Sequence, residues 1–395
     1  MSHPHNPNPL RLLPLLASIV AISPLAIDMY LPAMPTIAED LSTTTTAVQN
    51  SLSIYLAGYA VGMLIFGPLA DRIGRRKVVI MGLIGFAAFS IALAFAESIE
   101  SFLTMRFFQA AISSGATVVV PGVIRDMYGR HTAKGLSYVS MIMMVAPMIA
   151  PSIGSGILHF ASWRTIFVVL AIYSLIILGL SLWKLPSSMP SKKNRRWLHE
   201  FAHNYKTVFT HRTARLDIFS AMFATFAFFC YLTSISYVYI EHFGASETLF
   251  SILFGLNVVS LLASNLINSR LVEKLGSRKL LRFGTVYALF TGSFFFAVIQ
   301  LDLGIYWVAT ALFFLLGSLA FIATNSDGLV LNTFAEKSGT ATAVIGTLRF
   351  GSGAVAGPLL ALLFDGTPHN FAWLVMTALV MVFIVQLMNL RRPEQ

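Results

Sequence analysis

The chain alternates between long apolar stretches and short polar segments. Twelve stretches contain no Asp, Glu, Lys or Arg apart from Arg106 and Arg349, and they span 12–27, 47–70, 78–96, 101–124, 135–158, 165–183, 218–240, 248–269, 283–301, 303–326, 338–364 and 366–390. A helix needs about 17–25 apolar residues to cross a bilayer. All stretches but the first reach that length, and the first reaches it if it continues through Asp28 to Leu31. The pattern predicts twelve membrane-spanning helices.

Lipid leaves the backbone no water to bond with, so each span must satisfy its own hydrogen bonds as a helix. A membrane barrel would instead show short segments of alternating polarity, and the sequence has none. A cleavable signal peptide is a poor interpretation of the first stretch. Eleven further spans follow it, and no clear small-residue cleavage site precedes Asp28. We therefore expect an all-α membrane protein.

Composition supports this interpretation. Of the 395 residues, 56% are hydrophobic and 11% are charged, against roughly a quarter charged in soluble proteins. The mean hydropathy is +0.75. These values argue against a soluble enzyme and against a disordered or disulfide-stapled chain. The formal charge of +10 would suggest nucleic acid in a soluble protein, but cytoplasmic loops in a membrane protein.

The positions of the basic residues decide between these two readings of the charge. With the amino terminus in the cytoplasm, 24 of the 27 basic residues fall in cytoplasmic segments, and the opposite loops hold only Arg164. Cytoplasmic loops carry such an excess of Lys and Arg. We expect a protein of a bacterial-type inner membrane, with both termini on the cytoplasmic side. We expect no nucleic-acid partner.

The longest polar segment divides the chain into two halves of six spans. We expect an N-terminal half over 1–183, a linker over 184–215 and a C-terminal half over 216–395. Aromatic residues at four-residue spacing within 196–209 favour an amphipathic helix on the inner membrane surface, with a solvated linker as an equal alternative. The segment 71–77, Asp-Arg-Ile-Gly-Arg-Arg-Lys, recurs 202 positions later as Glu-Lys-Leu-Gly-Ser-Arg-Lys. Parallel repeats of this kind are typical of major facilitator transporters.

Several motifs make that resemblance specific. The segment 67–77, Gly-Pro-Leu-Ala-Asp-Arg-Ile-Gly-Arg-Arg-Lys, is similar to the facilitator motif between helices two and three. Arg106-Phe-Phe-Gln109 is similar to the helix-four motif of the drug:proton antiporter branch. The segment 146–154 resembles the antiporter motif of helix five, although Ala150 stands where that pattern prefers Gly. With 27–35, 123–128 and 162–167, these motifs resemble the bicyclomycin-resistance (Bcr/CflA) drug-efflux family.

This resemblance covers essentially the whole chain, and it implies a major facilitator fold that exports drugs or antibiotics in exchange for protons. It also implies that the inner-loop motif is a conformational latch, in which Asp71 helps to lock the halves and Arg75 reaches Asp126. The other residues of this latch are Gly67, Arg72, Gly74 and Arg76. In helix five, Pro147, Pro151 and Gly154 would shape a bend and seal the half–half interface against proton leak. Close helix packing is the simpler explanation of these small residues.

Charges inside a membrane are costly and usually face a cavity or a partner. Counted from the inner loops at 1.5 Å per residue, Asp28 and Arg106 both lie about 26–28 Å above them. An apolar cavity favours the neutral form of a carboxyl group, whereas a nearby Arg favours the ionised form. We hypothesise that Asp28 carries the proton or binds a cationic substrate group, and that Arg106 tunes it or binds substrate. A structural ion pair, or an Asp28 in the outer headgroup layer, is the alternative.

A second possible intramembrane pair is Asp327 and Arg349, at roughly 14 and 18 Å above their shared loop. We predict that the two side chains are close and neutralise each other. A structural salt bridge is the preferred interpretation, and a place in the substrate or proton path is the alternative. The family pattern favours Gln at position 349, so the pair is a departure from it.

Aromatic walls with few fixed polar groups suit varied, moderately apolar ligands. Most aromatic residues in a membrane nevertheless face lipid or packing neighbours. The candidate pocket residues on the spans are Tyr30, Tyr55, Tyr59, Gln109, Met141, Phe223, Phe226, Tyr231, Tyr237 and Asn257.

The sequence offers little to other kinds of chemistry. Cys230 is the single cysteine, and the chain contains no Walker loop, GxSxG or HExxH motif. We expect no enzyme activity, no metal and no cofactor, so that a proton gradient drives a monomeric transporter. Alternatives are an exporter of an endogenous metabolite such as an amino acid, a nutrient:proton symporter, or a transport-inactive receptor or scaffold.

Overall fold

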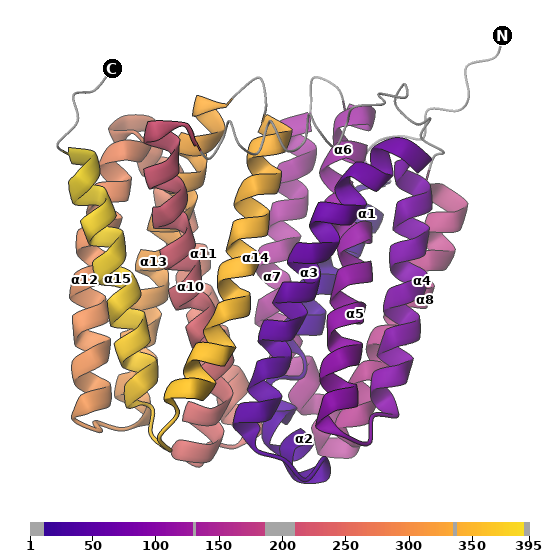
Figure 1. Cartoon of the computed structure of the whole chain (residues 1–395), viewed down its shortest axis with the longest axis horizontal. Helices are drawn as coiled ribbons and strands as arrows, with labels where there is room; N and C mark the ends of the chain where they lie inside the picture. Colours follow the sequence, from indigo (N-terminus) through magenta and orange to yellow (C-terminus); the bar gives the residue numbers. More distant parts are fainter. Residues whose placement is uncertain (1–11, 129–131, 186–209, 335–337, 391–395) are drawn as a thin grey trace. The chain divides into compact units, whose positions relative to one another are not determined.

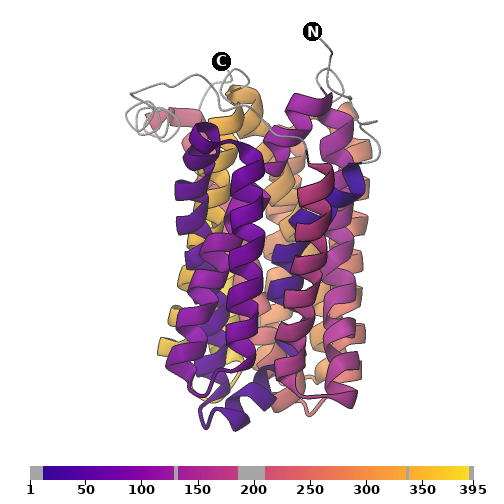
Figure 2. The same cartoon turned by 90° about the vertical axis from the view of Figure 1, so that its right-hand side faces the viewer.

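The apolar stretches of the sequence form long helices. The computed structural model describes residues 12–128, 132–185, 210–334 and 338–390, and within them eleven helices are long and apolar enough to cross a membrane. The fifth predicted span corresponds to α7, whose described side chains begin at Val145. Figures 1 and 2 show that, within each part of the chain, the long helices run side by side. The protein is a multi-pass, all-helical membrane protein.

The helices of the N-terminal part follow the predicted spans, with two breaks. They are α1 (Leu13–Asp28), the 3-10 turn η2 (Leu31–Ala33), α2 (Met34–Asp40), α3 (Thr45–Ile73), α4 (Arg75–Ala94), α5 (Ile99–Val118), α6 (Val120–Tyr128), α7 (Thr132–Phe160) and α8 (Trp163–Lys184). The first span breaks directly after Asp28, and the fourth breaks at Val119. In each case a proline follows closely, Pro32 or Pro121, and it lacks the N–H that would continue the helix.

The C-terminal part repeats this plan of long helices. It consists of α10 (Arg212–Ser236), the π-helical turn η4 (Tyr237–His242), α11 (Glu247–Leu275), α12 (Ser277–Gln300), α13 (Ile305–Thr333), α14 (Ser338–Leu363) and α15 (His369–Leu390). The seventh span begins at Arg212, six residues before the charge-free stretch starts. The six residues before that stretch, among them Asp217, are therefore in the helix.

Contacts between residues divide the chain into two units. The first unit comprises residues 1–43 and 54–195, and the second comprises 44–53 and 196–395. In the first, α1 packs against α5, α7 and α8, and α4 packs against α5 and α8. In the second, α10 packs against α13, α14 and α15, and α12 packs against α13 and α15. The amphipathic helix expected within 196–209 lies outside the described residues.

The recurring loop motif has one structural basis in both units. Gly74 separates α3 from α4 with φ 94°, and Gly276 separates α11 from α12 with φ 77°. In each turn the glycine has a positive φ, a backbone conformation in which a residue with a Cβ atom would be strained. The shared glycine therefore makes the same tight turn twice.

Candidate functional site

Arg106 is a fully buried charged group of the first unit. It lies on α5 with 0% of its surface exposed, and its Nη1 donates to Oε1 of Gln109 over 2.8 Å. Gln109 Nε2 in turn donates to Ser90 Oγ at 2.8 Å, and Ser90 donates to the Phe86 carbonyl on α4. This chain of bonds ties the guanidinium group to two helices.

Aromatic rings hold the rest of the guanidinium group. Its Cζ lies 4.4 Å from the ring centre of Tyr30 and 4.3 Å from that of Tyr55, and both tyrosines are fully buried. Desolvated contacts of this kind attract a cation by about 2 kcal/mol. Nε and Nη2 of Arg106 have no hydrogen-bond partner among the described residues. The positive charge of Arg106 is thus stabilised by the faces of two tyrosine rings and by one amide oxygen. Two of its nitrogen atoms remain able to donate further hydrogen bonds.

Glycines let α3 come close enough to place Tyr55 beside Arg106. A Cβ atom at Gly58 would lie 2.3 Å from the Phe107 carbonyl oxygen, and one at Gly62 would lie 2.1 Å from that of Ala111. Spacing small residues four apart is a common means of close helix contact in membranes. On the same face of α3, Tyr59 stacks on Tyr55 at 6.4 Å and shares a 2.6 Å hydrogen bond with Thr117.

Asp28 lies at the end of α1, immediately before the break. Its exposed fraction is 3%, and its Oδ1 has no hydrogen-bond partner among the described residues. Within that part of the chain, no ion pair joins Asp28 to Arg106. A buried ionised carboxylate normally needs a partner, so Asp28 is a candidate for a group that binds a proton. The alternative of a direct structural ion pair with Arg106 is not realised in this structure.

Arg164, the one loop arginine that departs from the expected charge asymmetry, has a clear structural use. Arg164 forms an ion pair with Asp40 and donates to the Ala96 carbonyl, and the neighbouring Trp163 donates to Asp40 over 3.0 Å. Arg164 therefore joins the ends of α2, α4 and α8.

In the second unit, the sequence candidates divide into separate groups. Asn257 donates to the Tyr231 hydroxyl at 3.1 Å, and Tyr231 stacks on Phe254. Tyr237 instead donates to the Gly366 carbonyl, in the turn before α15. Phe223 and Phe226 are half-buried on α10, and the side chain of Met141 lies outside the described residues.

Asp327 and Arg349 form an ion pair. Their side chains, on α13 and α14, approach to 2.7 Å between Oδ2 and Nη2 and are 23% and 31% exposed. The pair is surrounded by apolar residues of α10, α13 and α14, namely Ile218, Ala221, Met222, Val330, Ile345 and Leu348.

The loop motif at residues 67–77 of the first unit makes helix-to-helix contacts. Arg75 donates to the Gly122 carbonyl on α6 at 2.7 Å, and Arg76 donates to the Leu182 carbonyl on α8 at 2.6 Å. Arg72 is exposed, and a Cβ at Gly67 would meet open space. The side chains of Asp71 and Asp126 lie outside the described residues.

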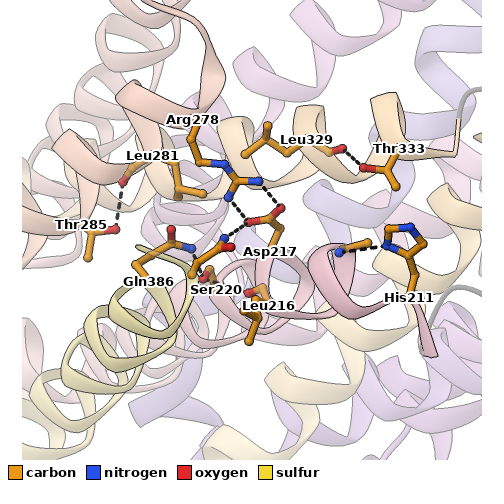
Figure 3. A network of polar contacts seen from close by, with 12 residues as sticks. His211, Leu216, Asp217, Ser220, Arg278, Leu281, Thr285, Leu329, Thr333 and Gln386 are labelled. Carbon is orange, nitrogen blue, oxygen red and sulfur yellow. Dashed lines mark hydrogen bonds and ion pairs between the residues drawn. The ribbon is translucent and has the colours of Figure 1, made fainter. Parts of the chain in front are cut away.

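A further polar cluster was not among the sequence candidates. Asp217 accepts two hydrogen bonds from Arg278, at 2.6 and 3.0 Å, and Asn389 donates to it at 3.3 Å. Beside it Gln386 donates to Ser220, as Figure 3 shows. The sequence signal was the position of Asp217 at the edge of an apolar span, only one residue outside its charge-free run. In the sequence, Arg278 belongs to the basic residues of a predicted loop.

Comparison with known proteins agrees with this architecture. The family model described as "Major Facilitator Superfamily" matches residues 16–358. A bicyclomycin resistance protein homolog of Haemophilus influenzae is 30% identical, over 86% of both chains. A chloramphenicol resistance protein of Pseudomonas aeruginosa is 28% identical, over 91% of this chain and 86% of that one. The crystal structure of a D-xylose-proton symporter covers 98% of both chains at 15% identity with a TM-score of 0.77, which supports the fold. The chain is a transporter, not an enzyme, and it belongs to the Major Facilitator Superfamily, in the group of the bicyclomycin-resistance proteins.

Proposed function

We propose that this transporter exports drug-like small molecules across a bacterial inner membrane in exchange for protons, by alternating access. Two relatives are named for resistance to bicyclomycin and to chloramphenicol, which supports antibiotics as the substrate class. The sequence contains no Walker motif, so a gradient is the natural energy source. The basic loops favour a chain with both termini in the cytoplasm, acting as a monomer without a cofactor.

The observation that carries the proposal is the contrast between Asp28 and Arg106. Both are buried in one unit, but Arg106 is held by Gln109 and two tyrosine rings, whereas Asp28 Oδ1 has no described partner. In our proposal Asp28 binds a proton on one side of the membrane and releases it on the other. A cationic or hydrogen-bonding group of the substrate takes the place of the proton in the other part of the cycle.

Arg106 has a fixed role in this scheme. Its charge is permanent, because a guanidinium group does not lose its proton in proteins. Two of its nitrogens lack a described partner, so it can donate hydrogen bonds to a polar group of the substrate while the tyrosine rings contact the apolar part. Such a wall of aromatic residues with few polar groups suits substrates of varied shape.

The test is proton-driven drug uptake into inverted membrane vesicles, with wild-type protein and Asp28→Asn. We expect Asp28→Asn to lose uptake by at least ~100-fold, since a neutral amide cannot carry the proton. Asp302→Asn is the matched control, because Asp302 is 71% exposed and Asn tolerates its positive φ of 48°. It should transport as wild type does.

Bicyclomycin and chloramphenicol are the first compounds for this assay, beside a susceptibility panel in an efflux-deficient bacterium. Wild-type coupling in the Asp28→Asn protein would remove Asp28 from the mechanism. If wild-type protein changes susceptibility to no compound, the export of an endogenous metabolite becomes the better conclusion.

A further inference from the structure

The break of α1 directly after Asp28 is held in a specific way. The helix cannot continue from Asp28, because Pro32 has no N–H to donate to the Asp28 carbonyl. The chain closes a 3-10 turn instead, in which the Ala33 N–H donates to the Tyr30 carbonyl at 2.9 Å. The carbonyl of Met29 therefore does not receive the N–H that an α-helix would supply from Ala33.

That carbonyl is directed at α7. A Cβ atom on Gly154 would lie only 1.9 Å from the Met29 oxygen and 2.9 Å from the Met29 carbonyl carbon. The same Cβ would lie 3.3 Å from Cγ of Pro32. Backbone atoms cannot move aside as a flexible side chain can, so only a glycine allows α7 to approach α1 this closely.

The next glycine of α7 shows that the constraint is local. Gly156 is exposed, and a Cβ atom there would meet nothing within 4 Å. Both glycines are in the same helix and both have ordinary negative φ values, because neither is among the positive-φ residues. The difference between them is the close approach of Met29 and Pro32 to Gly154.

We propose that Gly154 is a positioning residue for Asp28. Because Gly154 has no side chain, the Met29 carbonyl packs directly against its α-carbon. This contact fixes the backbone at the break of α1, and with it the position of the Asp28 carboxyl group. The proposal rests on the proposed function, in which Asp28 binds the proton. Asp28 and Met29 are consecutive residues, so the Asp28 carboxyl group and the Met29 carbonyl group that packs on Gly154 are joined through a single peptide bond. A displacement at Met29 therefore moves the carboxyl group within its buried surroundings.

The experiment measures Asp28 without using a transported drug. A hydrophobic carbodiimide reacts with protonated carboxyl groups in apolar surroundings. We would follow the modification of Asp28 against pH in purified full-length protein and locate it by peptide mass spectrometry, with Asp28→Asn as the blank. The variants are Gly154→Ala and, as matched control, Gly156→Ala.

We expect Gly154→Ala to move the midpoint of this pH profile by about half a pH unit or more, because the surroundings of the carboxyl group set its protonation. Gly156→Ala should keep the wild-type midpoint. A purely structural role of Gly154 would lower the yield or the unfolding temperature without moving the midpoint. An unmoved midpoint in the monodisperse Gly154→Ala protein overturns the proposal.

Pro32→Ala perturbs the same contact between the Met29 carbonyl and Gly154, but from the side of α1. It restores an N–H at the break, so it should also displace the Asp28 profile. If Gly154→Ala yields no monodisperse protein, an unchanged profile in Pro32→Ala overturns the proposal. A displaced Asp28 profile, combined with normal transport by Asp28→Asn, would retain the positioning role and reject the proposed function instead.

Discussion

Arg106 of the first unit is held differently from Arg278 and Arg349 of the second. In the first, Arg106 is held by the amide of Gln109 and by the rings of Tyr30 and Tyr55, with no carboxylate within ion-pair distance among the described residues. In the second, Arg278 and Arg349 each face a carboxylate, at 2.6 and 2.7 Å. A charge paired with its opposite is neutralised, whereas a charge held by rings and amides stays uncompensated. The first unit is therefore the place where a change of protonation has the larger electrical effect.

The largest effect is expected where a carboxylate is most buried. Asp217→Ala leaves Arg278 without its partner inside the bundle, and breaking a buried pair costs about 3–5 kcal/mol. Asp217 is 2% exposed in its side chain. We expect a strongly lowered midpoint of thermal unfolding in detergent, followed by tryptophan fluorescence.

The double variant Asp217→Asn/Arg278→Gln is the control for this prediction. It removes both charges and should recover most of the lost stability, since no charge is left unpaired. A double variant as unstable as the single one would show that the ion pair is not the source of the effect.

A smaller effect of the same kind is expected at the partly exposed pair. Asp327→Asn should cost about 1–3 kcal/mol, below the range for a fully buried pair, because the two side chains are 23% and 31% exposed. Asp327→Asn/Arg349→Gln should restore the unfolding midpoint. If the double variant is stable but does not export drugs, the pair belongs to the transport path and the purely structural interpretation is wrong.

The smallest effect on stability is expected at Arg106. Arg106→Met loses the ring contacts and the bond to Gln109, but it also removes a buried charge whose desolvation is costly. It leaves no carboxylate without its partner, so the unfolding free energy should change by only about 1 kcal/mol. Drug export should nevertheless be lost. A loss of stability as large as that of Asp217→Ala would contradict the contrast between the two units.

The sequence led directly to several of these residues. The cost of charge in lipid singled out Asp28, Arg106, Asp327 and Arg349 from their positions in or beside apolar stretches, and helical rise placed Asp327 near Arg349, where the structure has an ion pair. The same reasoning missed Asp217. When a span is defined as a run without charged residues, a charged residue in the first turns of the helix falls outside the span by definition.

Contacts between helices were harder to foresee. Tyr237 and Tyr231 belong to one apolar span, but the first bonds to the Gly366 carbonyl and the second to Asn257. Which way each tyrosine points depends on the packing of neighbouring helices, and hydropathy carries no information about that.

The sequence by itself determined that this protein is a bundle of membrane-spanning helices, because lipid permits long apolar stretches only that form. It also determined where charges are rare enough to matter. Only the tertiary structure decided which of those charges are paired, because an ion pair depends on a few ångströms of separation between helices. The contact of the Met29 carbonyl with Gly154 likewise depends on a few ångströms of separation between helices. A glycine is visible in any sequence, but the backbone that approaches it is not.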